Sequence, residues 1–160
     1  MPQDLCLEAC LKAKGKALQI SLEAIASVKG KLEATLARRA EHYFSEKYAG
    51  LEAWASGNLE DFGKLITSSG LSSIKNYECG AEPLIQLYEI LVRAPGVYGA
   101  RFSGAGFRGC CIAFVDASRA VEAASFVRDE YYKLQPALAS QINPDNAVLI
   151  CEAGHSARVL

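Results

Sequence analysis

The sequence lacks the features of a membrane-spanning, secreted or nucleic-acid-binding protein. None of its apolar runs approaches the roughly 18 residues of a membrane-spanning helix. Acidic residues interrupt the first ten positions, where a secretory signal has a basic start and an apolar core. The 17 Lys and Arg against 18 Asp and Glu give a net charge of −1, so there is no basic excess for nucleic acid or an anionic membrane. We therefore expect a soluble, cytoplasmic protein that binds neither.

Cysteine is too sparse for a disulfide-stapled secreted scaffold, with six in 160 residues. Cys6 and Cys10 have helical spacing that could present two thiolates to one metal ion. No CxxC and no second pair completes a tetrahedral set, so we predict no metal site. Cys110 and Cys111 lie inside an apolar run, as buried thiols often do.

The two histidines also lack partners at ligand spacing. His42 is expected to cap or pack on its helix, and His155 is expected to be exposed in the tail. Trp54, Tyr43 and Phe44 share a helical stripe and are assigned to the core or to a domain interface rather than to a sugar platform.

What is present is an ordinary globular composition, with 51% apolar and 22% charged residues over the length of one domain. Apolar periodicity and capping residues predict five helices and three strands. The helices cover about 16–29, 36–56, 59–66, 83–93 and 120–134, and the strands cover 97–103, 110–115 and 147–151. Asn58 and either Asp116 or Ser118 are the expected N-caps, and residues 67–73 are either a loop or the continuation of the third helix. This order predicts an α+β fold with helices on one face of a small, mostly antiparallel sheet.

Between the first two strands lies a loop with the spacing G-x-G-x-x-G, at Gly104, Gly106 and Gly109. A dinucleotide-binding loop of this kind must follow a strand and open a helix, whereas this one opens into a strand. The V-A-I-K, H-R-D and D-F-G motifs of protein kinases and a G-x-x-x-x-G-K-[ST] phosphate loop are absent. Three glycines still allow a close approach to an anion or another backbone, and the alternative is a small hairpin turn.

The glycine loop and its surroundings resemble the GHMP small-molecule kinases, most closely the galactokinase type. Gly99–Cys110 is similar to their third motif, G-S-R-M-T-G-[AG]-G-F-G-G-C. Further similarities to R-A-x-H, G-D-x-x-x-F-G and Y-E-V-S-C-x-E-L-D occur at 39–42, 57–63 and 77–84. Arg108, in place of a glycine, and the tail Val148–Gly154 are similar to the plant galacturonokinase branch. The resemblance covers 35–160, whereas 1–34, an expected helical segment, match poorly.

The resemblance implies that 35–160 form the ferredoxin-like C-terminal domain of a two-domain enzyme. That enzyme transfers the γ-phosphoryl group of ATP, with Mg²⁺, to the anomeric hydroxyl of a sugar. Its N-terminal domain carries the sugar signature, the phosphate loop and the catalytic Asp, none of which is in this chain. Thr67–Ser73 echoes the phosphate loop but lacks the leading P-x-G-x-G. We therefore expect no activity and no tight ATP or Mg²⁺ binding from this chain alone, and expect its partner to be the missing N-terminal domain.

The resemblance assigns the third motif to support of the phosphate loop, facing nucleotide and sugar. The residues concerned are Arg101, Ser103, Gly104, Ala105, Gly106, Phe107 and Gly109. Two further residues are candidates for the substrate side. Arg108 could attract a phosphate or a uronate carboxylate, and its alternative role is that of a solvent-facing hairpin arginine. Tyr77 lies in a family-like segment, and its alternative role is packing. No residue is assigned as catalytic base or metal ligand.

Two classes of function stay open. The first is a domain of a sugar kinase, with galacturonate as the best match for the sugar and galactose as the alternative. The second is a non-enzymatic, truncated remnant that binds a ligand or a partner. An upstream reading frame that encodes the phosphate loop would favour the first class. In either case an apolar domain interface would be exposed, and it would favour self-association.

Overall fold

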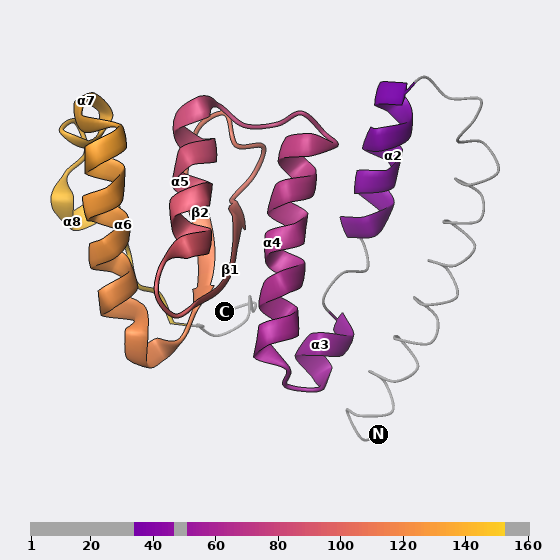
Figure 1. Ribbon diagram of the computed structural model, residues 1–160, viewed down its shortest axis with the longest axis horizontal. Helices are drawn as coiled ribbons and strands as arrows, with labels where there is room; N and C mark the ends of the chain where they lie inside the picture. Colours follow the sequence, from indigo (N-terminus) through magenta and orange to yellow (C-terminus); the bar gives the residue numbers. More distant parts are fainter. Residues whose placement is uncertain (1–33, 47–50, 153–160) are drawn as a thin grey trace, which may run out of the picture.

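The computed structural model describes residues 34–46 and 51–152, which form a mixed α+β fold (Figure 1). The predicted α+β class is confirmed: the described residues contain seven α-helices, one short 3₁₀ helix and a two-stranded sheet. In chain order the elements are α2 (Ala34–Glu46), α3 (Leu51–Ala55), α4 (Leu59–Lys75), α5 (Glu82–Arg93), β1 (Val97–Phe102), β2 (Cys111–Val115), η2 (Ala117–Arg119), α6 (Ala120–Leu134), α7 (Pro136–Ala139) and α8 (Pro144–Ala147). The first predicted helix, Cys6, Cys10 and His155 lie outside the described residues.

Helix α4 is one continuous helix from Leu59 to Lys75. Its N-cap is Asn58, as predicted, and the Asn58 Oδ1 accepts a hydrogen bond from the backbone N–H of Asp61 at 3.0 Å. The loop interpretation of residues 67–73 is wrong, because this polar stretch continues the helix. Small residues of α4 are needed for packing, since Gly63 and Gly70 are buried where α4 meets β1.

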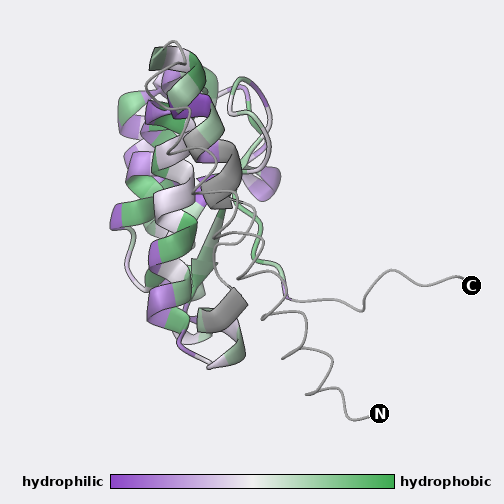
Figure 2. Cartoon of the chain, turned by 90° about the vertical axis from the view of Figure 1, so that its right-hand side faces the viewer, coloured by the Kyte–Doolittle hydropathy of each residue, from purple (hydrophilic) through white to green (hydrophobic). Residues whose placement is uncertain are grey.

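The sheet consists of β1 and β2, which pair antiparallel with Ala100 opposite Ala113 and Phe102 opposite Cys111. Ala100 and Phe102 are buried, and they form the first core cluster together with Leu84 and Tyr88 of α5. A second cluster joins α5 to α6 through Ile90, Ala94, Ala123 and Val127. Figure 2 shows the helices gathered beside the strands, and α5 thus connects the sheet to α6.

The predicted third strand over 147–151 is wrong for the described residues. Ala147 ends α8, which begins at Pro144 and is capped by Asn143, whose Oδ1 accepts from the N–H of Asp145 at 3.0 Å. Residues 148–152 have no strand pairing. Val148 packs against the second core cluster, whereas the side chains of the next two residues are exposed. The apolar run 147–151 therefore contributes Val148 to the core and does not pair with a neighbouring strand.

The predicted helix over 36–56 is divided in the structure into α2 and α3, with residues 47–50 outside the described part. Trp54 on α3 is 60% exposed and is therefore not a core residue of the described fold. The side chains of Tyr43 and Phe44 are not among those described. Within the described ranges, every helix is too short or too polar to span a bilayer.

Candidate functional site

The glycine loop occupies residues 103–110 and closes the β1–β2 hairpin. The N–H of Ser103 donates to the carbonyl of Cys110 at 2.9 Å, which fixes the base of the loop. Gly104, Gly106 and Gly109 have φ values of 112°, 74° and 100°, in a region that side chains rarely adopt. The three glycines of the motif are therefore required by the backbone path of this loop.

The centre of the loop is anchored, whereas its flanks are open. Gly106 is buried, and its carbonyl accepts a hydrogen bond from the N–H of Ala81, the N-cap of α5, at 2.8 Å. A Cβ on Gly106 would lie 2.5 Å from Cε2 of Phe102, whereas a Cβ on Gly104 or Gly109 would meet no atom within 4 Å. The loop thus packs tightly at one point and presents the rest of its backbone to solvent.

A turn at residues 76–81 packs against the glycine loop. Its Cys79 N–H donates to the carbonyl of Ser73 at 3.0 Å, which ties the turn to α4. Gly80 in this turn is close to Phe102: an added Cβ would lie 2.9 Å from Cζ of the ring. Phe102, which is 2% exposed, therefore packs against both the turn and Gly106.

Helix α2 holds this turn through Glu78. Glu78 is the one described non-glycine residue with positive φ, at 61°, and its carboxylate lies 2.8 Å from Arg38 and 3.5 Å from Arg39. The neighbouring Tyr77 ring lies 5.6 Å from the Arg39 guanidinium and 5.3 Å from the His42 ring. Sequence reasoning missed this cluster, since nothing in a single sequence connects residues 40 positions apart.

The side chain of His42 contacts residues outside its own helix. Its Nδ1 lies 2.9 Å from Oγ of Ser72 on α4, in addition to the ring contact with Tyr77. The prediction that His42 caps or packs on its own helix stays a prediction, and the structure adds contacts with α4 and with Tyr77. Tyr77 is 45% exposed and is engaged by α2.

The structure brings most of the predicted site residues together on the glycine loop. The loop members Ser103, Ala105, Phe107 and Arg108 are exposed. Arg101 lies on β1, where its Nε donates to the carbonyl of Phe102 at 3.3 Å. Tyr77 is not on the loop but in the supporting turn.

The loop carries positive charge but no carboxylate, imidazole or amine. Residues 99–110 contain no Asp, Glu, His or Lys, and their only formal charges are those of Arg101 and Arg108. Nowhere in the ranges 34–46 and 51–152 do three His, Cys, Asp or Glu residues gather as a metal site would require. Mg²⁺ is held by carboxylates and phosphates, so the residues present do not fit it. The chemical groups that this loop presents are therefore backbone N–H groups and two guanidiniums, which are the types of group that contact a phosphate.

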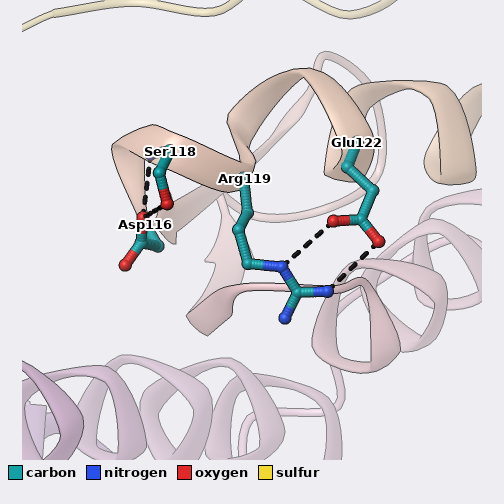
Figure 3. Close-up of polar contacts among 4 residues, drawn as sticks. All are labelled: Asp116, Ser118, Arg119 and Glu122. Carbon is teal, nitrogen blue, oxygen red and sulfur yellow. Dashed lines mark hydrogen bonds and ion pairs between the residues drawn. The ribbon is translucent and has the colours of Figure 1, made fainter.

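Asp116 follows β2 and caps the 3₁₀ helix η2, which leads into α6, whereas the predicted cap was for the helix over 120–134 itself (Figure 3). Its Oδ1 accepts from the backbone N–H of Ser118 at 2.8 Å and from the Ser118 hydroxyl at 2.5 Å. These hydrogen bonds lower the pKa of the Asp116 carboxyl. Its Oδ2 accepts from the Tyr98 hydroxyl at 3.2 Å, so the carboxylate also fixes a side chain of β1.

Two adjacent thiols at the end of the loop differ in environment. Cys110 is exposed, whereas Cys111 is half-buried, with its Sγ 3.7 Å from the carbonyl oxygen of Leu84. Burial raises the pKa of the Cys111 thiol to about 12. The end of the loop and the start of β2 therefore carry one accessible thiol and one protected thiol.

We expect iodoacetamide at pH 8 to alkylate Cys110 at least about tenfold faster than Cys111, because the thiolate is the reacting species. Mass spectrometry of Cys110→Ser and Cys111→Ser after short pulses would measure each rate separately, with the exposed Cys151 as internal reference. In urea the two rates should converge. Equal rates in the folded protein would contradict the assigned burial of Cys111.

Comparison with known proteins identifies sugar kinases among the relatives of this chain. The family model "GHMP kinases C terminal" matches residues 49–133. The galacturonokinase of Arabidopsis thaliana is 70% identical over 82% of this chain, and the match covers 32% of that protein. The galactokinase of Bos taurus is 32% identical over 71% of this chain and 30% of its own length. A crystal structure of Lactococcus lactis galactokinase complexed with galactose is similar with a TM-score of 0.64 and 31% identity, over 71% of this chain and 30% of that one. The chain therefore spans about a third of the length of these relatives.

Proposed function

Because the chain belongs to the GHMP kinase family and corresponds to its C-terminal region, we propose that it forms one wall of the active site of an ATP-dependent sugar-1-kinase. The carrying observation is the glycine loop, whose three positive-φ glycines expose backbone at its flanks and anchor it at Gly106. In this proposal the domain has the ferredoxin-like topology of the family and works in the cytoplasm.

The role of the loop is to pack against the phosphate-binding part of the enzyme. Phosphoryl transfer depends on positioning and on neutralising charge around the phosphates, for which a kinase uses Mg²⁺ together with its own cations. The exposed loop residues on either side of Gly106 can supply close backbone contact, and Arg101 can supply positive charge nearby. The base, the metal ligands and the phosphate loop belong to the remaining two thirds of the enzyme.

Galacturonate is the proposed acceptor, and its anomeric hydroxyl is the group phosphorylated. The support is the 70% identity to a galacturonokinase, against 32% to the bovine galactokinase. Arg108 is exposed on the loop, where it could reach a uronate carboxylate or remain in solvent. Galactose is the alternative acceptor, and a non-enzymatic domain that binds a ligand or partner is the alternative function.

We expect the purified 160-residue chain to form no sugar 1-phosphate from ATP, Mg²⁺ and either galacturonate or galactose, because it spans about a third of its relatives and its described residues form no cluster of metal ligands. Phosphorus NMR would detect the product. A chimera in which this chain replaces the matched region of the Arabidopsis galacturonokinase should phosphorylate galacturonate. Product from the chain alone would contradict the account of missing groups, and a folded but inactive chimera would contradict the proposed function.

A further inference from the structure

Glu78 has a backbone conformation that its residue type rarely adopts. Its φ of 61° lies in the left-handed region, where glycine and asparagine are the usual residues. A glutamate held there costs free energy, so its surroundings have to fix it in place. Glycine already occupies a second positive-φ position of this turn, at Gly80. The glutamate at residue 78 is therefore explained by what its side chain contacts rather than by what its backbone prefers.

The Glu78 carboxylate joins the turn to two arginines of α2. Its Oε1 accepts a hydrogen bond from Nη2 of Arg38 at 2.8 Å, and its Oε2 lies 3.5 Å from Nη2 of Arg39. The Arg39 guanidinium also lies 5.6 Å from the centre of the Tyr77 ring. Two successive residues of the turn are thus held by two successive arginines of one helix.

The same turn holds the glycine loop at its other end. Three residues after Glu78, the N–H of Ala81 donates to the carbonyl of Gly106 at 2.8 Å. An added Cβ at Gly80 or at Gly106 would lie within 3 Å of the Phe102 ring, so the turn and the loop both pack closely on that ring. A shift of the turn at Glu78 would therefore move the N–H that fixes the centre of the loop.

We propose that Glu78 is a positioning residue for phosphoryl transfer, which acts through the turn to fix the glycine loop relative to α2. This inference rests on the proposed function, because the position of the loop affects catalysis only where the loop lines an active site. Glu78 contacts the arginines, and the loop contacts the reacting groups. A small misplacement of such a support lowers the rate of the chemical step, even when the residue changed is remote from it.

The first experiment measures amide hydrogen exchange in the ¹⁵N-labelled chain by NMR. Glu78→Gln removes the charge and keeps the size of the side chain. The Ala81 N–H should then exchange faster by about threefold or more, because two exposed ion pairs are lost and each is weak by itself. The reference amide is that of Asp116, which donates to the carbonyl of Gly96 at 2.8 Å, at the end of the hairpin away from the loop. Its rate should stay unchanged.

Two further variants separate the ion pairs from other causes. Glu122→Gln is the matched control, because it removes the exposed ion pair with Arg119 on α6, where the two side chains lie 3.0 Å apart. It should leave the exchange of Ala81 unchanged. Glu78→Asn removes the long carboxylate but suits the left-handed backbone better than glutamate does. It should accelerate the exchange of Ala81 as Glu78→Gln does, although it relieves backbone strain.

The second experiment measures steady-state kinetics in the chimera of the previous section. Glu78→Gln should lower kcat for galacturonate by about fivefold or more, with KM for ATP and for galacturonate changed by less than about twofold. Arg38→Met should have a similar effect, and the double variant should be little worse than either single one, because both remove the same contact. The Glu122→Gln chimera should keep the kcat of the unmodified chimera.

The outcomes distinguish this proposal from the proposed function. An active chimera whose kcat is unaffected by Glu78→Gln would overturn the positioning role and leave the kinase function standing. A folded but inactive unmodified chimera would overturn the function and the catalytic part of this proposal, whereas selective acceleration of Ala81 would still support the link from Glu78 to the loop. Equal acceleration of Ala81 and Asp116 would overturn that link, because it would show a loss of overall stability. Additive losses in the double variant would overturn it as well.

Discussion

Gly63→Ala should destabilise the fold by about 3 kcal/mol, measured by urea unfolding followed by circular dichroism. Helix propensity alone predicts the opposite change in the free energy of unfolding, because alanine is more favourable than glycine in a helix interior by about 1 kcal/mol. The reason lies in the contact between α4 and β1. A Cβ on Gly63 would lie 2.5 Å from both the carbonyl carbon and the Cβ of Tyr98, far inside contact distance.

The clash at Gly63 cannot be relieved by rotating a side chain. The obstructing atoms belong to or adjoin the backbone of β1, and Gly99 on that strand faces back at Gly63, with an added Cβ 2.7 Å from the Gly63 carbonyl carbon. The helix or the strand would have to move, and either would open the packing beneath Phe62 and Tyr98. The variant should therefore lower the unfolding midpoint without changing the amount of helix in the folded state.

Ser68→Ala is the matched control for this prediction. Ser68 lies on the same helix and is exposed, so the substitution adds helix preference without meeting a neighbour. It should leave the free energy of unfolding unchanged or raise it slightly. If Gly63→Ala behaved like Ser68→Ala, the close approach of α4 to β1 would be refuted.

The same helix shows what could be predicted from the sequence. Asn58 was identified as a cap because its side chain and the following acidic residues form a local pattern. The small residues that follow were ambiguous, because Gly and Ser are frequent both in loops and at close helix–strand contacts. Only the position of β1 distinguishes the two uses. Local chemistry thus predicts the start of α4, whereas its packing against β1 accounts for the small residues beyond residue 66.

One part of the candidate site could likewise be predicted from the sequence, and another part could not. The glycine loop was found from spacing alone, since its conformation depends on residues that are adjacent in the chain. The support behind it was not found, because Glu78 and its two arginines come from separate segments brought together by the fold. The strand predicted over 147–151 was wrong because an apolar run reports burial, whereas a strand also needs a paired backbone.

Gly106→Ala should cost about 2–4 kcal/mol, and most of that cost should come from Phe102 rather than from backbone strain. Gly104 provides the comparison that separates the two causes. Both glycines have positive φ, so both substitutions strain the backbone, but only Gly106 faces a neighbour. At 112°, φ of Gly104 is further from the left-handed helical region than the 74° of Gly106. The strain at Gly104 is therefore at least comparable, and the excess cost at Gly106 is a lower bound on the clash.

A double-mutant cycle with Phe102→Leu tests the source of that excess. Phe102→Leu alone should destabilise the core, because the ring is 2% exposed and packs against Tyr88 at 6.1 Å. In this background Gly106→Ala should cost less by about 1 kcal/mol or more, since the smaller side chain leaves room for the new methyl group. Urea unfolding of the four proteins would give the coupling energy. A coupling near zero would show that the loop is not anchored on Phe102. A positive coupling would mean that the Phe102 ring, which packs in the core, also determines the position of the glycine loop. Core packing and loop geometry could then not vary independently.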